Sequence, residues 1–141
     1  KGVQFSDTIT LNGRIDMIEP KSSNEVIVHD FKTGKPKSRK SIDGSNPTSD
    51  RNYLRQLVFY KILLDHHQDG RRRMIGGTID YVEPSESGNF KSEHFEITDE
   101  MVKDLEQQIT VVGKQIWDVT FWDERCIDPE CEYCKMRNLM N

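Results

Sequence analysis

Residues 25–32, Glu-Val-Ile-Val-His-Asp-Phe-Lys, are the stretch that decides how this chain folds. Apolar residues recur here with the two-residue period of a β-strand, so that Val26 and Val28 share one face. Asp30 and Lys32 are also two positions apart and therefore project from a single face of the same strand. The segment predicts a strand with an apolar body and a charged end.

The segments on either side of this strand predict an α/β domain. Two strands precede it, at residues 9–11 and 14–19, and with 25–32 they predict a β-meander. Downstream we expect a long basic loop at 33–49, a helix capped by Ser49 or Asp50 and ending near residue 67, a hairpin of strands 73–82 and 90–97, a helix capped by Thr98, and an irregular tail over 121–141. The fold class expected is a mixed central β-sheet flanked by helices, in one domain over 1–141.

Composition restricts the partners of the chain. The start at Lys1 rather than Met predicts a fragment of a longer protein. No apolar run approaches the roughly 20 residues of a membrane span, so we expect no membrane contact and a cytoplasmic location. The net charge is −4, but residues 32–73 hold eleven Lys and Arg against four Asp and Glu. This block predicts a positive surface for an anionic partner, the alternative being a solvated loop and helix face.

Asp16 and Asp30 are candidate metal ligands. On neighbouring antiparallel strands both carboxylates can point to one side, and two carboxylates about 4–6 Å apart bind a hard cation such as Mg²⁺. The backbone carbonyl of Phe31 offers a further ligand. Lys32 would be costly beside a cation unless it acts on an anion or a water. A metal and a lysine beside a phosphate can activate water for phosphodiester cleavage, although Asp-x-Lys alone is common on exposed strands.

Three short motifs occur in order: Gly13-Arg14-Ile15-Asp16, then Asp30-Phe31-Lys32-Thr33-Gly34, then a helix with Gln56 and Tyr60 four positions apart. This ordered set resembles the RecB/AddB-type PD-(D/E)xK nuclease domain found in UvrD/Rep-type helicase–nucleases. Phe31 stands where members of that family often have Tyr. Each motif is weak alone, and the ordered trio is specific.

The resemblance implies roles for these residues. Asp16 and Asp30 would hold Mg²⁺ or Mn²⁺, Lys32 would orient or polarise the attacking water, and Gln56 and Tyr60 would lie at the active site beside the DNA backbone. The implied protein is a deoxyribonuclease, expected to be an exonuclease, in a helicase–nuclease of DNA repair or recombination, with single-stranded DNA or DNA ends and helicase motor domains as partners. The candidate DNA-binding residues are Arg14, Lys35, Lys37, Arg39, Lys40, Arg51 and Arg55.

Two other functions remain open at this point. One is a catalytically inactive module of the same fold that binds DNA or scaffolds a helicase complex. The intact Asp16, Asp30 and Lys32 argue against it. The other is a metal-dependent phosphohydrolase that acts on another substrate. The long basic loop favours a polymer as the substrate.

Cys126, Cys131 and Cys134 lie within nine positions, and an odd, clustered set is a poor disulfide framework. They fit either a zinc site completed by one more ligand or a vestigial, metal-free cluster motif. In the resembling family the trio is Cys-x2-Cys-x5-Cys, and Met140 stands at its third position, so we expect no iron–sulfur cluster. A reducing compartment is favoured. We expect the tail to pack through these residues: Trp117, Phe121, Trp122, Tyr133, Met136 and Leu139.

Overall fold

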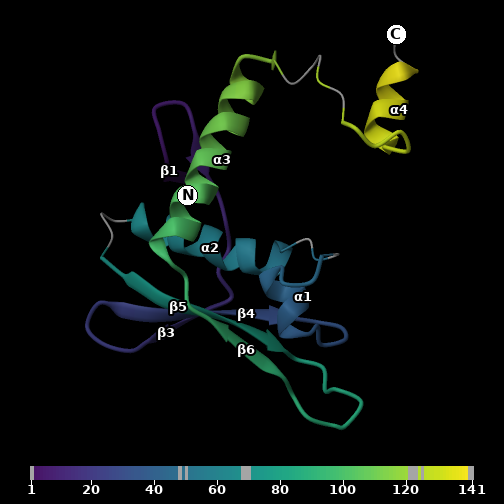
Figure 1. Ribbon diagram of the computed structural model, residues 1–141. Helices are drawn as coiled ribbons and strands as arrows, with labels where there is room; N and C mark the ends of the chain where they lie inside the picture. The colour runs from purple at the N-terminus through teal and green to yellow at the C-terminus, as the bar shows by residue number, and fades with distance from the viewer. Residues whose placement is uncertain are drawn as a thin grey trace.

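A mixed four-stranded sheet with strand order β3-β4-β5-β6 forms the centre of the fold, and helix α2 lies across one of its faces (Figure 1). The computed structural model describes residues 2–47, 49, 51–67, 71–120, 124 and 126–139. The strands are β1 (Val3–Gln4), β2 (Thr10–Leu11), β3 (Met17–Pro20), β4 (Glu25–Lys32), β5 (Arg73–Tyr81) and β6 (Ser92–Phe95). The helices are α1 (Arg39–Asp43), α2 (Asn52–Asp65), α3 (Asp99–Trp117) and α4 (Glu132–Asn138). The expected mixed α/β fold is confirmed.

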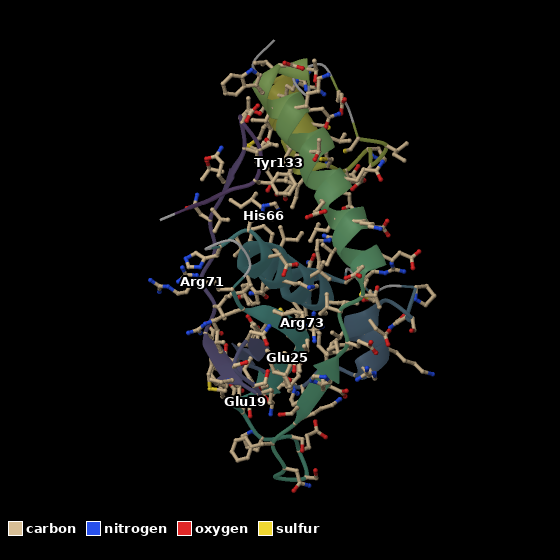
Figure 2. The ribbon with its side chains drawn as sticks, turned by 90° about the vertical axis from the view of Figure 1, so that its left-hand side faces the viewer. Glu19, Glu25, His66, Arg71, Arg73 and Tyr133 are labelled. Atoms are coloured by element: carbon tan, nitrogen blue, oxygen red, sulfur yellow. The ribbon has the colours of Figure 1, made fainter. Side chains whose placement is uncertain are left out.

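Strand β4 is the centre of the sheet, and its bounds are those predicted from the sequence. It pairs antiparallel with β3 and parallel with β5. Parallel neighbours need a crossover connection, which α1 and α2 supply. Glu25 and Arg73 are register partners where β4 and β5 begin and form an ion pair there, visible near the middle of Figure 2. The crossover brings α2 over the face of β4 that carries Asp30.

The core lies between α2 and the sheet. Leu57 and Ile62 of α2 and Val28 and Ile79 of the sheet are completely buried. Gly77 of β5 lies directly below Leu57, and a Cβ at that position would approach the Leu57 side chain to 2.9 Å. The glycine therefore lets the helix approach the sheet closely. Burying a Leu or Ile side chain is worth about 1.5–3 kcal/mol, so this layer fixes the height of α2 above β4.

The predicted β-meander is wrong in its first strand. Thr10 and Leu11 pair with Val3 and Gln4 in a separate two-stranded sheet, and β1 itself was not predicted. Strand β3 is also shorter than the predicted 14–19. Asp16 falls outside it because its carboxylate, rather than a backbone carbonyl, accepts the N–H of Phe31 at 3.0 Å.

The predicted loop at 33–49 contains a helix. Ser38 caps α1 by accepting from the Ser41 N–H, and Gly44 ends it in the left-handed region at φ 85°. The residue before α2 is Arg51, not Ser49, and Asp50 lies outside the described residues. Ser49 does not cap α2 because its hydroxyl bonds to the Arg51 N–H and to the Ser41 carbonyl.

Helix α3 begins as predicted, with the Thr98 hydroxyl accepting from the Met101 N–H at 3.3 Å. Its first half packs against α2, and further along Gly113 contacts the side chain of Ile9 from the β1–β2 connection. Within the described ranges no helix combines the length and apolar character that crossing a bilayer requires.

The C-terminal segment differs from the expectation of an irregular, packed tail. It contains α4, which lies beyond the end of α3 and away from the sheet (Figure 1). Tyr133 and Leu139 are 80% and 87% exposed, and Met136 and Trp117 are exposed as well. The predicted apolar packing of these four residues is therefore wrong: α4 buries none of its residues, and Trp117 ends α3 with its side chain exposed. Phe121 and Trp122, which were part of the same prediction, lie outside the described residues.

Candidate active site

Asp30 and Lys32 lie at the end of β4, on the face that α2 covers. Asp30 is 1% exposed, and it follows Val26 and Val28 on the buried face of the strand. Gln56 and Tyr60 are four residues apart on α2, so they share one side of the helix. The packing of α2 on the sheet turns that side toward the two charged residues of β4.

The four side chains form a closed ring of polar contacts. The Lys32 ammonium donates to Oε1 of Gln56 at 2.6 Å, and Nε2 of Gln56 donates to the Tyr60 hydroxyl at 2.6 Å. The Tyr60 hydroxyl donates to Oδ1 of Asp30 at 2.9 Å, and Oδ2 of Asp30 lies 2.7 Å from the Lys32 ammonium. The Lys32 ammonium must meet the oxygen of the Gln56 amide, which fixes the orientation of the amide, and Lys32, Gln56 and Tyr60 each have an acceptor within the ring.

Oδ2 of Asp30 can still accept a hydrogen bond or bind a cation. The ammonium of Lys32 is close enough for an ion pair, yet this buried oxygen has no hydrogen-bond partner of good geometry within the described part of the chain. The short distance between Lys32 and Asp30 reflects attraction between opposite charges. The poor hydrogen-bond geometry leaves a lone pair of Oδ2 free. Burial, and then the hydrogen bond to Asp30, raise the pKa of Tyr60 to about 12. Tyr60 therefore stays protonated near neutral pH and donates to the carboxylate.

Asp16 lies beside the end of β4 that carries Asp30. The β3–β4 pairing ends at Met17 and His29, and the carboxylate of Asp16, one residue before β3, accepts the N–H of Phe31 at 3.0 Å. The charge of Asp16 contributes to the raised pKa of Tyr60. Gly13, three residues upstream, lies against α2, where a Cβ would come within 2.4 Å of the Leu63 side chain. The glycine lets the chain pass close to α2 on its way to Asp16.

The Phe31 backbone faces Asp16. The Lys32 carbonyl accepts from the Val82 N–H on the β5 side, and successive residues of a strand alternate their backbone groups between its two neighbours. The N–H and carbonyl of Phe31 thus point to the β3 side, where the N–H meets Asp16. The Phe31 ring points to the opposite face of the sheet and is 44% exposed.

Sequence reasoning missed Tyr53 as a functional residue. Its ring lies 4.7 Å from the Lys32 ammonium and 4.3 Å from the Lys37 ammonium. Two cations over one aromatic ring are each stabilised by its negative face. The available signal was spacing, since positions 53, 56 and 60 follow one side of a helix.

The predicted DNA-binding residues differ in their surroundings. The Lys37 ammonium lies over the aromatic ring of Tyr53, which also contacts Lys32. Arg39 instead contacts the Glu93 carboxylate, the His94 carbonyl and the aromatic ring of Phe95. The others are exposed, with Arg51 beside Gly44 and Arg55 donating to Asn52: Arg14, Lys35, Lys40, Arg51 and Arg55. Their contact with DNA stays a prediction.

The opposite face of the sheet carries a second polar group. The His29 ring lies between Asp80, 2.7 Å from Nδ1, and Glu19, 3.1 Å from Nε2. Burial alone would lower the pKa of His29, but the bonds to Asp80 and Glu19 outweigh it and the pKa is raised. Lys21 first, and then His29, lower the pKa of Glu19. Because side chains alternate along a strand, His29 points to the face opposite Asp30, and Glu19 meets it there.

A cavity of about 400 Å³ lies between β2 and the end of α2 and shares no residue with the polar ring. Its lining combines apolar side chains such as Leu11 and Leu63 with the basic side chains of His67, Arg71 and Arg72, and it contains no carboxylate. We therefore place the candidate chemistry at the ring, where buried polar side chains converge.

The structure brings the three cysteines together in the C-terminal segment. Their sulfur atoms all lie within 4.8 Å of one another. Backbone N–H groups, that of Cys134 foremost, lower the pKa of Cys131. Hydrogen bonding to Cys131 and then to Cys134 raises the pKa of Cys126 to about 11.

Comparison with known proteins identifies the family of the chain. No curated protein matches the chain. The family model described as the PD-(D/E)XK nuclease superfamily matches residues 1–139. The matched range spans Asp16, Asp30, Lys32 and helix α2. Nuclease activity, generally dependent on a divalent metal ion, is the activity of this family, and the chain belongs to the PD-(D/E)XK nuclease superfamily.

Proposed function

We propose that this chain is the nuclease domain of a helicase–nuclease and hydrolyses phosphodiester bonds of DNA with Mg²⁺ or Mn²⁺. The observation that carries the proposal is the buried carboxylate of Asp30, whose Oδ2 lacks a hydrogen bond while it lies 2.7 Å from the Lys32 ammonium. A buried carboxylate oxygen with a free lone pair is costly in a structural role and useful in a metal site.

The donor set fits a hard divalent cation. We assign Asp16, Asp30 and the backbone carbonyl of Phe31 as ligands, all of them oxygen donors of the kind that Mg²⁺ and Mn²⁺ prefer. Asp16 is exposed and Asp30 is buried, so the site has one side open to a substrate and one side anchored in the core. When bound, the cation supplies charge to the scissile phosphate and lowers the pKa of a coordinated water.

Lys32 is the residue assigned to the attacking water and the scissile phosphate. Its ammonium is held by Gln56 on one side and by Asp30 on the other, with the ring of Tyr53 beneath it. Held in this way, the ammonium donates to the attacking water and to the phosphate oxygens, on which negative charge increases in the transition state. Gln56 and Tyr60 act as positioning residues, because they hold Lys32 and Asp30 respectively.

The substrate proposed is DNA, as single strands or ends. Lys37 and Lys32 both lie over the aromatic ring of Tyr53, so Lys37 is close to the polar ring. Lys35 and Lys40 are exposed and lie near Lys37 in the sequence. Lysine side chains that contact the phosphates of a nucleic acid release its counterions, which favours binding. Tyr53 adds an aromatic face of the type on which unpaired bases stack.

The cellular setting is part of the same proposal. The ordered motifs that end in Asp16, Lys32 and Tyr60 support a RecB/AddB-type exonuclease that acts with helicase motor domains in DNA repair or recombination. A cytoplasmic location fits three cysteine thiols that are not joined in disulfides.

The test measures cleavage of end-labelled and circular DNA, single- and double-stranded, with Mg²⁺, Mn²⁺ or chelator. Asp30→Asn keeps the size of the side chain and an oxygen that accepts from Tyr60. Its matched control is Asp80→Asn, which changes a carboxylate on the other face of the sheet. Loss of an outer-shell partner at a metal site costs about 10–100-fold, so loss of a ligand should cost at least about 100-fold.

The outcomes separate the alternatives. Metal-dependent loss of label from linear DNA, abolished in Asp30→Asn and retained in Asp80→Asn, supports an exonuclease. Cleavage of circular DNA supports an endonuclease. DNA binding without cleavage in any metal overturns the enzymatic proposal in favour of an inactive nuclease-fold module.

A further inference from the structure

The three cysteines meet although they come from two different stretches of backbone. Cys126 lies outside any helix or strand, Cys131 directly precedes α4, and Cys134 lies in the first turn of α4. The sulfurs of Cys126 and Cys134 are 3.5 Å apart, and all three sulfurs lie within 4.8 Å of one another. The chain must therefore fold back on itself between Cys126 and α4.

A turn at residues 128–131 produces this reversal. The Asp128 carbonyl accepts from the Cys131 N–H at 3.2 Å, and the Asp128 carboxylate accepts from the Glu130 N–H at 2.9 Å. The Cys131 carbonyl then accepts from the Lys135 N–H at 3.0 Å and opens the helix. These backbone bonds bring the three thiols to one side of the turn.

Apolar packing does not explain the convergence. None of the residues of α4 is buried, and Ile127 between the cysteines is fully exposed. Figure 1 shows the segment apart from the sheet, where the core could not support it. A segment this short without a core usually needs a cross-link or a metal ion to keep one conformation.

We propose that Cys126, Cys131 and Cys134 bind Zn²⁺ as three thiolates, with a water molecule as the fourth ligand. Two sulfurs bound to one zinc at about 2.3 Å in a tetrahedron lie roughly 3.8 Å apart, close to the separation of Cys126 and Cys134. The separation is far from the roughly 2.05 Å of a disulfide. The sequence holds three cysteines, one fewer than the four thiolates that an iron–sulfur cluster usually takes.

The ion would replace a hydrophobic core in this segment. Binding free energy at a structural zinc site is also folding free energy, so the ion should hold residues 126–139 in one conformation. The nuclease residues of β4 and α2 belong to other elements. The zinc site and the nuclease site can therefore succeed or fail independently.

The test uses the whole chain, purified under reducing conditions without added metal. Elemental analysis should find stoichiometric zinc, and replacement by Co²⁺ should give thiolate charge-transfer bands and the visible bands of a tetrahedral site. Cys126→Ser and Cys134→Ser should each lose the zinc and the cobalt bands. Tyr133→Ser is the matched control, because it changes an exposed side chain between two of the cysteines and leaves all three thiols.

A second readout follows the segment itself. Trypsin should cut at Lys135 and Arg137 faster after zinc is removed, and readded Zn²⁺, but not Mg²⁺, should restore protection. Absence of zinc from the wild-type chain together with unchanged cobalt spectra in Cys126→Ser overturns the proposal. A mass loss of two hydrogens, marking a disulfide, or stoichiometric iron in place of zinc, also overturns it.

Discussion

The hydroxyl of Tyr60 donates a 2.9 Å hydrogen bond to Oδ1 of Asp30 and so connects the middle of α2 to the end of β4. The contact satisfies one oxygen of a carboxylate that is 1% exposed and leaves the other without a hydrogen bond among the described residues. The helix therefore fixes the rotation of the carboxylate. A ligand held in one orientation pays less entropy when it binds a metal ion.

Replacing Tyr60 by Phe should weaken the metal site without removing a ligand. The ring still packs in the core, but Asp30 loses its donor and Gln56 loses its acceptor. We expect the Mg²⁺ concentration for half-maximal cleavage to rise about 10–100-fold, as it does when an outer-shell partner is lost. Leaving a buried acceptor unpaired should also lower the free energy of unfolding by about 1–3 kcal/mol.

Tyr53→Phe is the control for this change, because it removes a hydroxyl while the ring stays beside Lys32. It should leave the Mg²⁺ response unchanged. Metal titrations of cleavage and urea unfolding would measure the two effects. An unchanged Mg²⁺ response in Tyr60→Phe would show that the hydrogen bond does not orient Asp30 for metal binding.

Replacing Lys32 by Ala should lower kcat and leave metal binding intact. The ammonium is proposed to act on the attacking water, and positioned proton donors and acceptors contribute about 10²–10⁴-fold to rate. Removing a positive charge 2.7 Å from Oδ2 of Asp30 does not weaken that oxygen as a ligand. Calorimetry should therefore show Mg²⁺ binding at least as tight as in the wild-type chain.

The control for Lys32→Ala is Lys103→Ala, which removes the same charge from an exposed position of α3. Equal rates in Lys32→Ala and the wild type would remove Lys32 from the mechanism. A parallel loss of Mg²⁺ binding would mean that Lys32 supports the site structurally.

The sequence predicted the elements whose signals are local. The two-residue period defined β4 with its correct bounds, and the Thr98 cap defined the start of α3. The i, i+4 spacing of Gln56 and Tyr60 also placed them on one helix face, where they bond at 2.6 Å. Each of these signals depends on residues that are only a few positions apart in the sequence.

The missed features depend on distant segments. The pairing of β1 with β2 follows from contacts that two-residue strands do not encode in a periodic pattern. The closed ring requires α2 to lie over β4, which is fixed only by the parallel pairing of β4 with β5. Helix α1 is too short for a helical period to show, although Ser38 and Gly44 mark its two ends.

Lys35 and Lys37 should contribute to DNA binding through phosphate contacts. Replacing both by Ala should reduce affinity for single-stranded DNA of any sequence. Each phosphate contact contributes about 0.7 to the slope of log affinity against log salt on single strands, so the slope should fall by roughly 1.4. Fluorescence anisotropy over a range of salt concentrations measures the slope.

Lys103→Ala together with Lys114→Ala is the matched control for this change, because it removes two exposed charges from α3. The control should leave both affinity and slope unchanged. A loss of affinity confined to one DNA sequence, or a slope equal to that of the wild type, would contradict phosphate contacts by Lys35 and Lys37.

His29 should make the stability of the chain depend on pH near neutrality. Its folded pKa is raised above 6.5 because the bonds to Asp80 and Glu19 outweigh the effect of burial. The folded state therefore favours the charged ring, so the stabilisation is fully present below pH 6.5 and is lost as the pH rises through the folded pKa. Urea unfolding at a series of pH values should show this decline, and His29→Gln should abolish it. His67→Gln, an exposed histidine just after α2, should retain it. A histidine NMR titration with the His29 midpoint below 6.5 would reverse the expected sign, because the ring would then be held neutral between the two carboxylates.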